Sequence, residues 1–251
     1  MQKAEEPELR LFVFHHSGGS HLMYRDWPPC FPADWEVRAL DAPGRGPGDR
    51  RPPLNDAGAL VEHFLHELGP RLAGRFAFFG HSMGGLIAYE LTRRLVEAGR
   101  TPPLWLGVSA HDALLPDGNG AGRHLLSDAE LRRELAEMGG TSSSVLAHEE
   151  LWELFAPVIR ADLRISETWR TKPLTAPLPV PLSVYGGIRD EVAPPHRLEG
   201  WAAASAHFMG LRLFDGDHFY FRDRLPEVAG RIQDDVRRAL LLAPEPSMVP
   251  R

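Results

Sequence analysis

Cysteine is almost absent from this chain of 251 residues, which contains only Cys30. A single cysteine excludes an intramolecular disulfide, and it also excludes a zinc or iron–sulfur site built from cysteines alone. The hydrophobic core must therefore stabilise the fold, and an α/β domain of this length buries enough surface to need no covalent staple.

Long apolar runs and an excess of positive charge are missing too. No stretch approaches the ~18 uninterrupted apolar residues of a membrane-spanning helix. The first residues, MQKAEEPELR, lack the basic start and apolar run of a secretory signal. The net charge is −6, whereas nucleic-acid-binding proteins usually carry a basic surface. We expect a cytoplasmic protein that binds neither membranes nor nucleic acids.

What the sequence does contain is an alternation of short apolar runs and longer helical patterns. The expected strands are Leu9–Phe14, Trp35–Leu40, Arg75–Phe79, Leu104–Ser109, Val180–Tyr185 and Leu211–Phe214. The expected helices between and after them are Asn55–Leu72, Met83–Ala98, His196–Ala206 and Pro226–Leu242. This alternation predicts an α/β fold, with a mostly parallel sheet and helices on both of its faces.

The alternation is interrupted in the middle of the chain, where residues 113–177 show helical patterns without a convincing strand. A capping-box pattern at Ser127–Glu130 starts one helix, and His148–Trp169 forms a second that Pro157 should kink or split. We expect one domain over residues 1–251, with this insertion forming a helical lid above the substrate pocket. A purely decorative insertion is the alternative.

The strongest local motif is Gly80-His81-Ser82-Met83-Gly84, which lies between an expected strand and an expected helix. G-x-S-x-G in this context is typical of a nucleophile elbow, a sharp turn that exposes the serine hydroxyl. The turn should leave no room for a side chain at Gly80 or Gly84. Ser82 is therefore the candidate nucleophile.

A serine hydroxyl needs a base, and among the twelve histidines His218 has the most suitable position. It follows the last expected strand, where α/β-hydrolases place this residue. Three carboxylates are candidates for the orienting acid. Asp190 follows the preceding strand and is favoured, while Asp112, after an earlier strand, is the main alternative, with Glu191 a further one.

Two backbone N–H groups should stabilise the oxyanion of the intermediate. One is that of Met83, directly after the nucleophile. The other should come from the loop after the first strand, where the turn His16-Ser17-Gly18-Gly19 makes the Ser17 N–H the best candidate.

Several segments together resemble the discrete type II thioesterases of polyketide and nonribosomal peptide assembly lines, which belong to the α/β-hydrolase superfamily. They are FHHSGGS, APGRG, FFGHSMGGLIAYELTRRL, LSDAELRRELAEMGGTSSSVL and LFDGDHFYF. The resemblance extends over nearly the whole chain and places Ser82, Asp190 and His218 at the catalytic triad positions. It places Ser17 and Met83 at the oxyanion positions.

The resemblance implies a function in antibiotic biosynthesis. The reaction would be hydrolysis of acyl thioesters on the phosphopantetheine arm of an acyl or peptidyl carrier protein, for editing or release. It also implies that no metal or organic cofactor is needed. A general carboxylesterase or lipase, or a non-catalytic module that binds carrier proteins, are the alternatives.

Docking of a carrier protein would need basic residues on this acidic chain, because the resemblance implies an acidic partner. The candidates form two groups, one in the GRGPGDRR loop and one on the first helix of the insertion. They are Arg45, Arg50, Arg51, Arg132 and Arg133.

Overall fold

A parallel sheet forms the centre of the computed structural model, which describes residues 6–45, 49–112, 122–170 and 175–242. The strands are β1 (Leu9–Phe14), β2 (Trp35–Leu40), β3 (Phe76–His81), β4 (Leu106–Ser109), β5 (Leu182–Gly187) and β6 (Phe208–Phe214). Their order in the sheet is β2-β1-β3-β4-β5-β6, and all neighbours pair in parallel. The parallel sheet predicted from the sequence is confirmed, and the carboxyl ends of all six strands meet at one edge.

The central strands are apolar along their length because helices or loops cover them on both faces. All six residues of β3 are buried, as are all six of β5. The rings of Phe12, Phe76 and Phe78 pack edge to face at this core, with centroids 6.4 and 6.1 Å from Phe12. Truncating one such phenylalanine to alanine typically costs about 3–5 kcal/mol of folding free energy.

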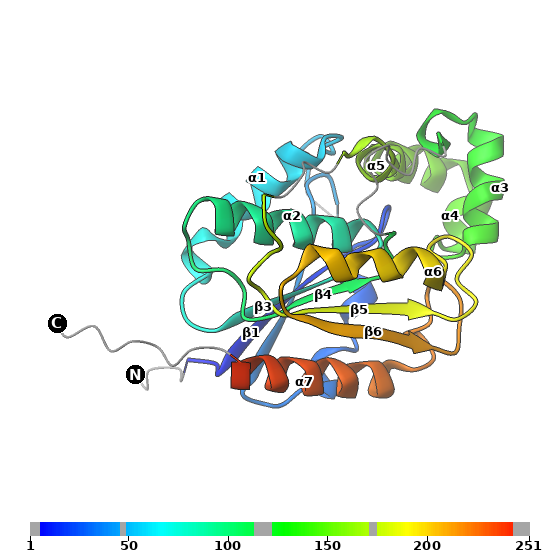
Figure 1. Cartoon of the computed structure of the whole chain (residues 1–251). Helices are drawn as coiled ribbons and strands as arrows, with labels where there is room; N and C mark the ends of the chain where they lie inside the picture. Colours follow the sequence, from blue (N-terminus) through cyan, green and yellow to red (C-terminus); the bar gives the residue numbers. More distant parts are fainter. Residues whose placement is uncertain (1–5, 46–48, 113–121, 171–174, 243–251) are drawn as a thin grey trace.

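Helices lie on both faces of the sheet, as predicted (Figure 1). Helices α1 (Ala57–Leu68), α2 (Met83–Glu97) and α6 (Pro195–Leu198) cover one face, and α7 (Leu225–Leu242) covers the other. The 3₁₀ helix η5 (Glu199–Ala204) continues α6, so the pattern predicted as one helix forms two elements. Three further 3₁₀ helices are η1 (His21–Tyr24), η2 (Pro28–Cys30) and η3 (Gly69–Arg71).

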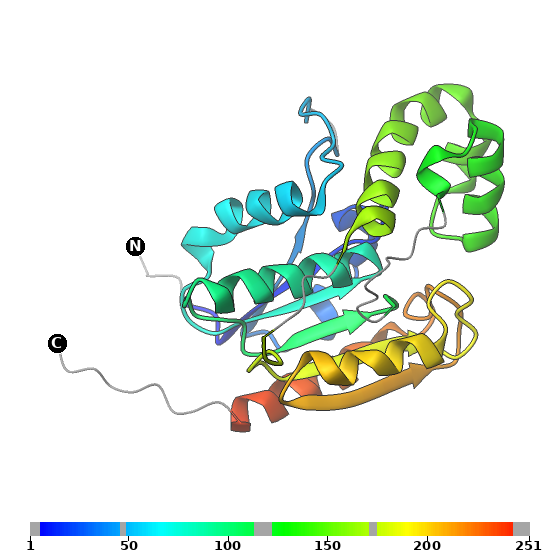
Figure 2. The same cartoon turned by 45° about the horizontal axis from the view of Figure 1, so that its top comes forward.

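Between β4 and β5 the chain forms a separate group of helices beside the carboxyl ends of the strands (Figure 2). It consists of η4 (Arg123–Leu125), α3 (Asp128–Met138), α4 (Ser143–Ala147) and α5 (Glu149–Thr168). The capping box of Ser127 and Glu130 is confirmed at the start of α3. The predicted start of this insertion, residue 113, lies outside the described residues, and its predicted end, Pro177, lies between α5 and β5.

One detail of the insertion differs from the prediction. Helix α5 continues unbroken through Pro157, so the predicted split is wrong. Trp152, Ile159 and Leu163, which lie on both sides of Pro157, belong to one apolar cluster. In the described part of the chain, no helix is both long and apolar enough to cross a membrane.

The strand ends also differ from the prediction, because pairing with neighbours determines where each strand stops. Strand β3 extends to His81 since Gly80 pairs with Phe14 and His81 pairs with Ser109. Strand β6 begins at Phe208, which pairs with Leu182 next to a bulge. The extension of β3 brings the sheet directly to Ser82.

Candidate active site

Ser82 occupies a strained turn between the end of β3 and the start of α2. Its backbone has φ 55° and ψ −120°, a conformation that costs a non-glycine residue about 1–3 kcal/mol. The Ser82 N–H donates to the Ser109 carbonyl at 2.7 Å, which ties the turn to the end of β4. The geometry is that of a nucleophile elbow, with Ser82 only half-buried.

The two glycines of the motif allow this turn to form. A Cβ atom at Gly80 would overlap the Gly84 carbonyl, and one at Gly84 would overlap the carbonyl of Phe14. Both contacts involve backbone, which cannot move aside without disrupting β1 or α2. The prediction that neither position has room for a side chain is confirmed.

His218 and Asp190 form a buried pair next to the elbow. His218 Nδ1 lies 2.8 Å from Asp190 Oδ2, and both residues are at least 97% buried. The other carboxylate oxygen accepts the N–H groups of Val192 (2.8 Å) and Ala193 (2.9 Å). Because an ionised carboxylate can only accept, Nδ1 is the donor, and Nε2 of a neutral His218 carries a free lone pair.

Close backbone packing brings Asp190 to the histidine. Asp190 follows β5 and His218 follows β6, and these strands are neighbours in the sheet. A Cβ atom at Gly187, the last residue of β5, would overlap the Asp217 carbonyl. The loop after β5 can therefore lie directly against the turn that carries His218.

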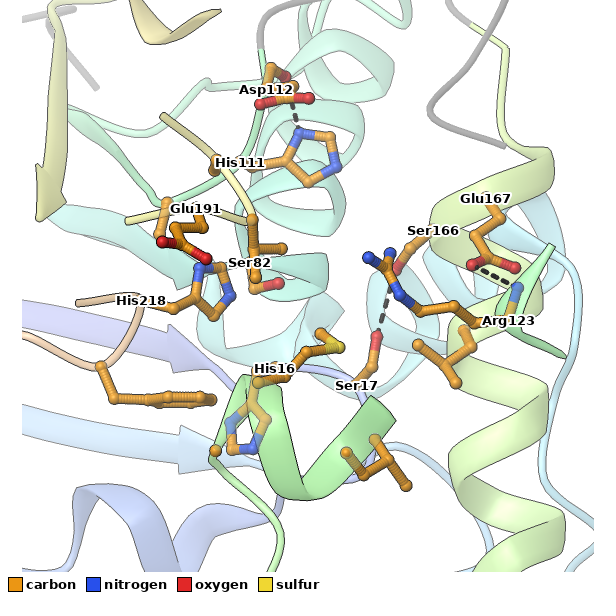
Figure 3. Close-up of a pocket in the computed structure, with 18 of the residues that line it drawn as sticks. His16, Ser17, Ser82, His111, Asp112, Arg123, Ser166, Glu167, Glu191 and His218 are labelled. Carbon is orange, nitrogen blue, oxygen red and sulfur yellow. Dashed lines mark hydrogen bonds between the residues drawn. The ribbon is translucent and has the colours of Figure 1, made fainter. Parts of the chain in front are cut away.

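The two alternative acids have other positions. Asp112 is buried, and its Oδ2 accepts a hydrogen bond from Arg197 Nη1 at 3.2 Å. Burial raises the pKa of Asp112, and Arg197 partly opposes this effect. Glu191 lines the pocket near His218 (Figure 3). Within the described residues, neither carboxylate is hydrogen-bonded to His218, whereas Asp190 is.

Of the two predicted oxyanion donors, Ser17 lines the same pocket as Ser82, and Met83 directly follows Ser82 in the chain. Met83 is the first residue of α2, so its N–H lies in the first turn, where helical N–H groups have no partner within the helix. Ser17 lies in a turn closed by a hydrogen bond from Gly19 N–H to the His16 carbonyl at 2.9 Å. Neither the Met83 nor the Ser17 N–H has an acceptor among the residues that the structure describes. Both are available to a ligand.

The pocket has a volume of about 210 Å³ and lies between the sheet and the inserted helices (Figure 3). Ser82 and His218 line it, as do Leu135, Met138 and Leu163 of the insertion. An acyl group bound here would contact both parts of the protein.

Two buried histidines complete the pocket wall. Burial lowers the pKa of His16 to about 3 and that of His111 to about 4. Both rings are therefore neutral near pH 7. His16 belongs to the turn that was predicted to carry the Ser17 N–H, whereas His111 was not predicted from the sequence.

A buried chain of hydrogen bonds beneath the site was not predicted from the sequence. Ser109 Oγ bonds to His81 Nδ1 at 2.8 Å and to the Tyr220 hydroxyl at 2.7 Å. This chain of hydrogen bonds connects the ends of β3 and β4 to the turn that carries His218. Serine and tyrosine carry no local pattern that would predict such a pairing.

The expectation that Arg45 belongs to an exposed docking patch is wrong. Its side chain is only 4% exposed and forms a buried ion pair with Asp162 of α5. Arg45 Nε also donates to the Gly19 carbonyl at 3.0 Å. Arg45 is therefore part of the support for the loop that contains Ser17.

The described residues include no group of three or more His, Cys, Asp or Glu side chains arranged to hold a metal ion. The expectation that the reaction needs no metal or organic cofactor stays a prediction.

An elbow serine and a buried His–Asp pair at the carboxyl edge of a parallel sheet define the α/β-hydrolase class. The thioesterase domain family model matches residues 9–236. The chain therefore belongs to the thioesterase family and is a hydrolase that acts on thioesters, as the resemblance in the sequence predicted.

Known proteins of this family resemble the chain over nearly its full length. The gramicidin S biosynthesis protein GrsT of Aneurinibacillus migulanus is 30% identical over 95% of this chain and 92% of that protein. Thioesterase PikA5 of Streptomyces venezuelae is 31% identical over 92% of this chain and 82% of its own. The structure of RedJ, a thioesterase of the prodiginine pathway in Streptomyces coelicolor, has a TM-score of 0.83 and 30% identity. It covers 94% of this chain and 90% of RedJ.

Proposed function

We propose that this thioesterase hydrolyses acyl groups from the phosphopantetheine arm of a carrier protein, using Ser82, His218 and Asp190 as its triad. The observation that carries the proposal is the buried hydrogen bond between His218 and Asp190 beside the elbow serine, in a chain of the thioesterase family. Relatives that function in gramicidin S and prodiginine biosynthesis support an assembly-line substrate.

The first half of the reaction acylates Ser82. His218 Nε2 takes the hydroxyl proton as the serine oxygen attacks the thioester carbonyl. The Met83 and Ser17 N–H groups stabilise the oxyanion of the tetrahedral intermediate. Asp190 keeps His218 in the required tautomer and stabilises the imidazolium. The carbon–sulfur bond then breaks, and the phosphopantetheine thiol leaves with the proton from His218.

The second half releases the acid. His218 removes a proton from water, and the resulting hydroxide attacks the acyl-serine carbonyl. The same two N–H groups stabilise the second oxyanion, and Ser82 recovers its proton from His218. Apart from the substrate and one water molecule, every reacting group in these steps belongs to the chain.

The helices inserted between β4 and β5 act in this proposal as the lid of the acyl pocket, within a single domain of residues 1–251. Support comes from Leu135, Met138 and Leu163, which line the same pocket as Ser82. The partner is an acyl or peptidyl carrier protein, and the reaction takes place in the cytoplasm.

The decisive experiment compares three substrates that share one acyl group: an acyl-loaded carrier protein, an acyl-phosphopantetheine and a simple ester. We expect kcat/KM to be highest for the carrier protein. Ser82→Ala should reduce turnover on the order of 10³-fold or more, while the matched variant Ser144→Ala, at an exposed serine of α4, keeps wild-type turnover.

A simple ester hydrolysed as well as the carrier-bound thioester would indicate a general carboxylesterase instead. Binding of carrier protein without turnover by the wild type would indicate a binding module. Full turnover by Ser82→Ala would reject the assigned nucleophile.

A further inference from the structure

We infer that Asp162 on α5 is a positioning residue that sets the geometry of the oxyanion hole. It would do so by holding the loop that carries the Ser17 N–H. The inference rests on the proposed function, because it assigns to Ser17 the second oxyanion donor. According to this inference, the inserted helices both cover the pocket and position an oxyanion donor.

The contacts of Asp162 reach both sides of the loop. Its Oδ2 accepts the Gly18 N–H at 2.7 Å and also the Arg45 guanidinium. Arg45 in turn donates from Nε to the Gly19 carbonyl at 3.0 Å. One buried ion pair therefore holds a backbone donor and a backbone acceptor of the two residues that follow Ser17.

Because the pair is buried, its two side chains are held in one orientation. The side chains of Asp162 and Arg45 are 1% and 4% exposed. Charge-assisted hydrogen bonds are stronger than neutral ones, and water does not compete for them here. The loop cannot shift without separating two charges in a dry environment.

Other residues on the same face of α5 contact the loop at helical spacing. Ile159 lies against the backbone of Gly18. Ser166 Oγ lies 3.1 Å from Ser17 Oγ, and the two side chains face each other in the pocket (Figure 3). The position of α5 therefore determines where the Ser17 N–H points.

Displacement of the Ser17 N–H should lower kcat and leave KM nearly unchanged. The Ser17 N–H stabilises charge that develops only as the tetrahedral intermediate forms. Loss of one oxyanion donor costs about 10²–10³-fold in kcat, and a displaced donor should cost less.

The test measures hydrolysis of a small acyl thioester by the Asp162→Asn variant. The concentration of active sites is determined by complete reaction with a fluorophosphonate, and kcat is expressed per active site. We expect kcat to fall about ten- to a hundredfold, with KM within twofold of wild type. Affinity for a trifluoromethyl ketone of the same acyl group should fall by the same factor as kcat. The matched control Asp128→Asn removes an exposed ion pair with Arg160 in the same insertion and should change neither.

A second variant separates positioning from stability. Asp162→Leu/Arg45→Met removes both charges, and replacing a whole buried pair by apolar residues is often tolerated, unlike removal of one partner. We expect the melting temperature of the double variant to exceed that of Asp162→Leu, while kcat per site stays at least tenfold below wild type, because Gly18 has lost its acceptor.

The inference would be overturned if kcat per titrated site were unchanged in either variant. It would also be overturned if the double variant regained wild-type kcat together with its stability. Failure of the wild type to hydrolyse acyl-carrier protein would reject the proposed function instead. The ratio of variant to wild type on the small thioester would still measure positioning.

Discussion

Two buried carboxylates near His218 differ in what surrounds them, and this difference supports Asp190 as the orienting acid of the proposed triad. Asp190 accepts hydrogen bonds from His218 and from two backbone N–H groups. These bonds hold its carboxylate in one orientation. Asp112 faces Arg197, whose side chain is half exposed. Only Asp190 has a fixed geometry toward the imidazole.

We predict that Asp190→Asn lowers kcat by several orders of magnitude, since an amide that donates to Nδ1 would favour the wrong tautomer. The equivalent change in a serine protease costs about 10⁴-fold. Asp112→Asn, the matched variant, should lower kcat by less than about tenfold. Steady-state kinetics on one acyl thioester measures both. The assignment is wrong if Asp112→Asn is the damaging change and Asp190→Asn is tolerated.

Residues that belong to a local motif could be placed from the sequence. Ser82 has glycines at fixed spacing, and His218 follows a recognisable strand. The sequence left Asp190 and Asp112 as alternatives because each follows a strand that ends at the same edge of the sheet. Arg45 and Asp162 are 117 residues apart and look like ordinary surface charges. Only the packing of α5 on the loop makes them partners.

Among the elements, the strands and long helices were predictable because their apolar residues recur with a clear period. Their ends were not, because strand pairing decides them. Helix α4 was not predicted, since it begins in the serine run Ser142-Ser143-Ser144, which is equally typical of a loop. The apolar cluster of the insertion, separate from the main core, also depends on tertiary contacts.

Helix α3 contributes Met138 to the pocket and exposes Arg133 to solvent. We predict that Arg133→Glu raises KM for an acyl-carrier protein about three- to tenfold, because an acidic carrier would meet a like charge. The effect should shrink as salt rises from 50 to roughly 500 mM, and KM for a small thioester should stay unchanged.

The matched control for this prediction is Arg100→Glu, an exposed charge just after α2. It should leave KM for the carrier protein unchanged. Equal losses on carrier and small thioester for Arg133→Glu would mean that α3 is not a docking surface.

For the whole molecule, buried neutral histidines make folding stability depend on pH. Burial lowers the pKa of His15, His16, His81 and His111. Below about pH 6.5 the unfolded chain binds protons at these residues and the folded protein does not. The stabilisation is therefore complete above pH 6.5 and is lost as the pH falls toward 4.

We predict that the free energy of unfolding, measured by urea denaturation, decreases steadily from pH 7 to pH 4.5. Each buried histidine contributes a slope of up to about 1.4 kcal/mol per pH unit. His111→Gln removes one such group, so its slope should be smaller by about that amount. A slope equal to that of the wild type would show that His111 is protonated in the folded protein too.

The strand order β2-β1-β3-β4-β5-β6 has a consequence for synthesis on the ribosome. From β3 onward, each new strand is added beside a strand that has already emerged, so the sheet can grow in the order in which it is translated. Ser82 and the Ser17 loop emerge in the first third of the chain, whereas Asp190 and His218 follow the last two strands, β5 and β6. Under the proposed triad, a nascent chain carries its serine long before it carries the base, and it gains hydrolytic activity only when β6 joins the sheet.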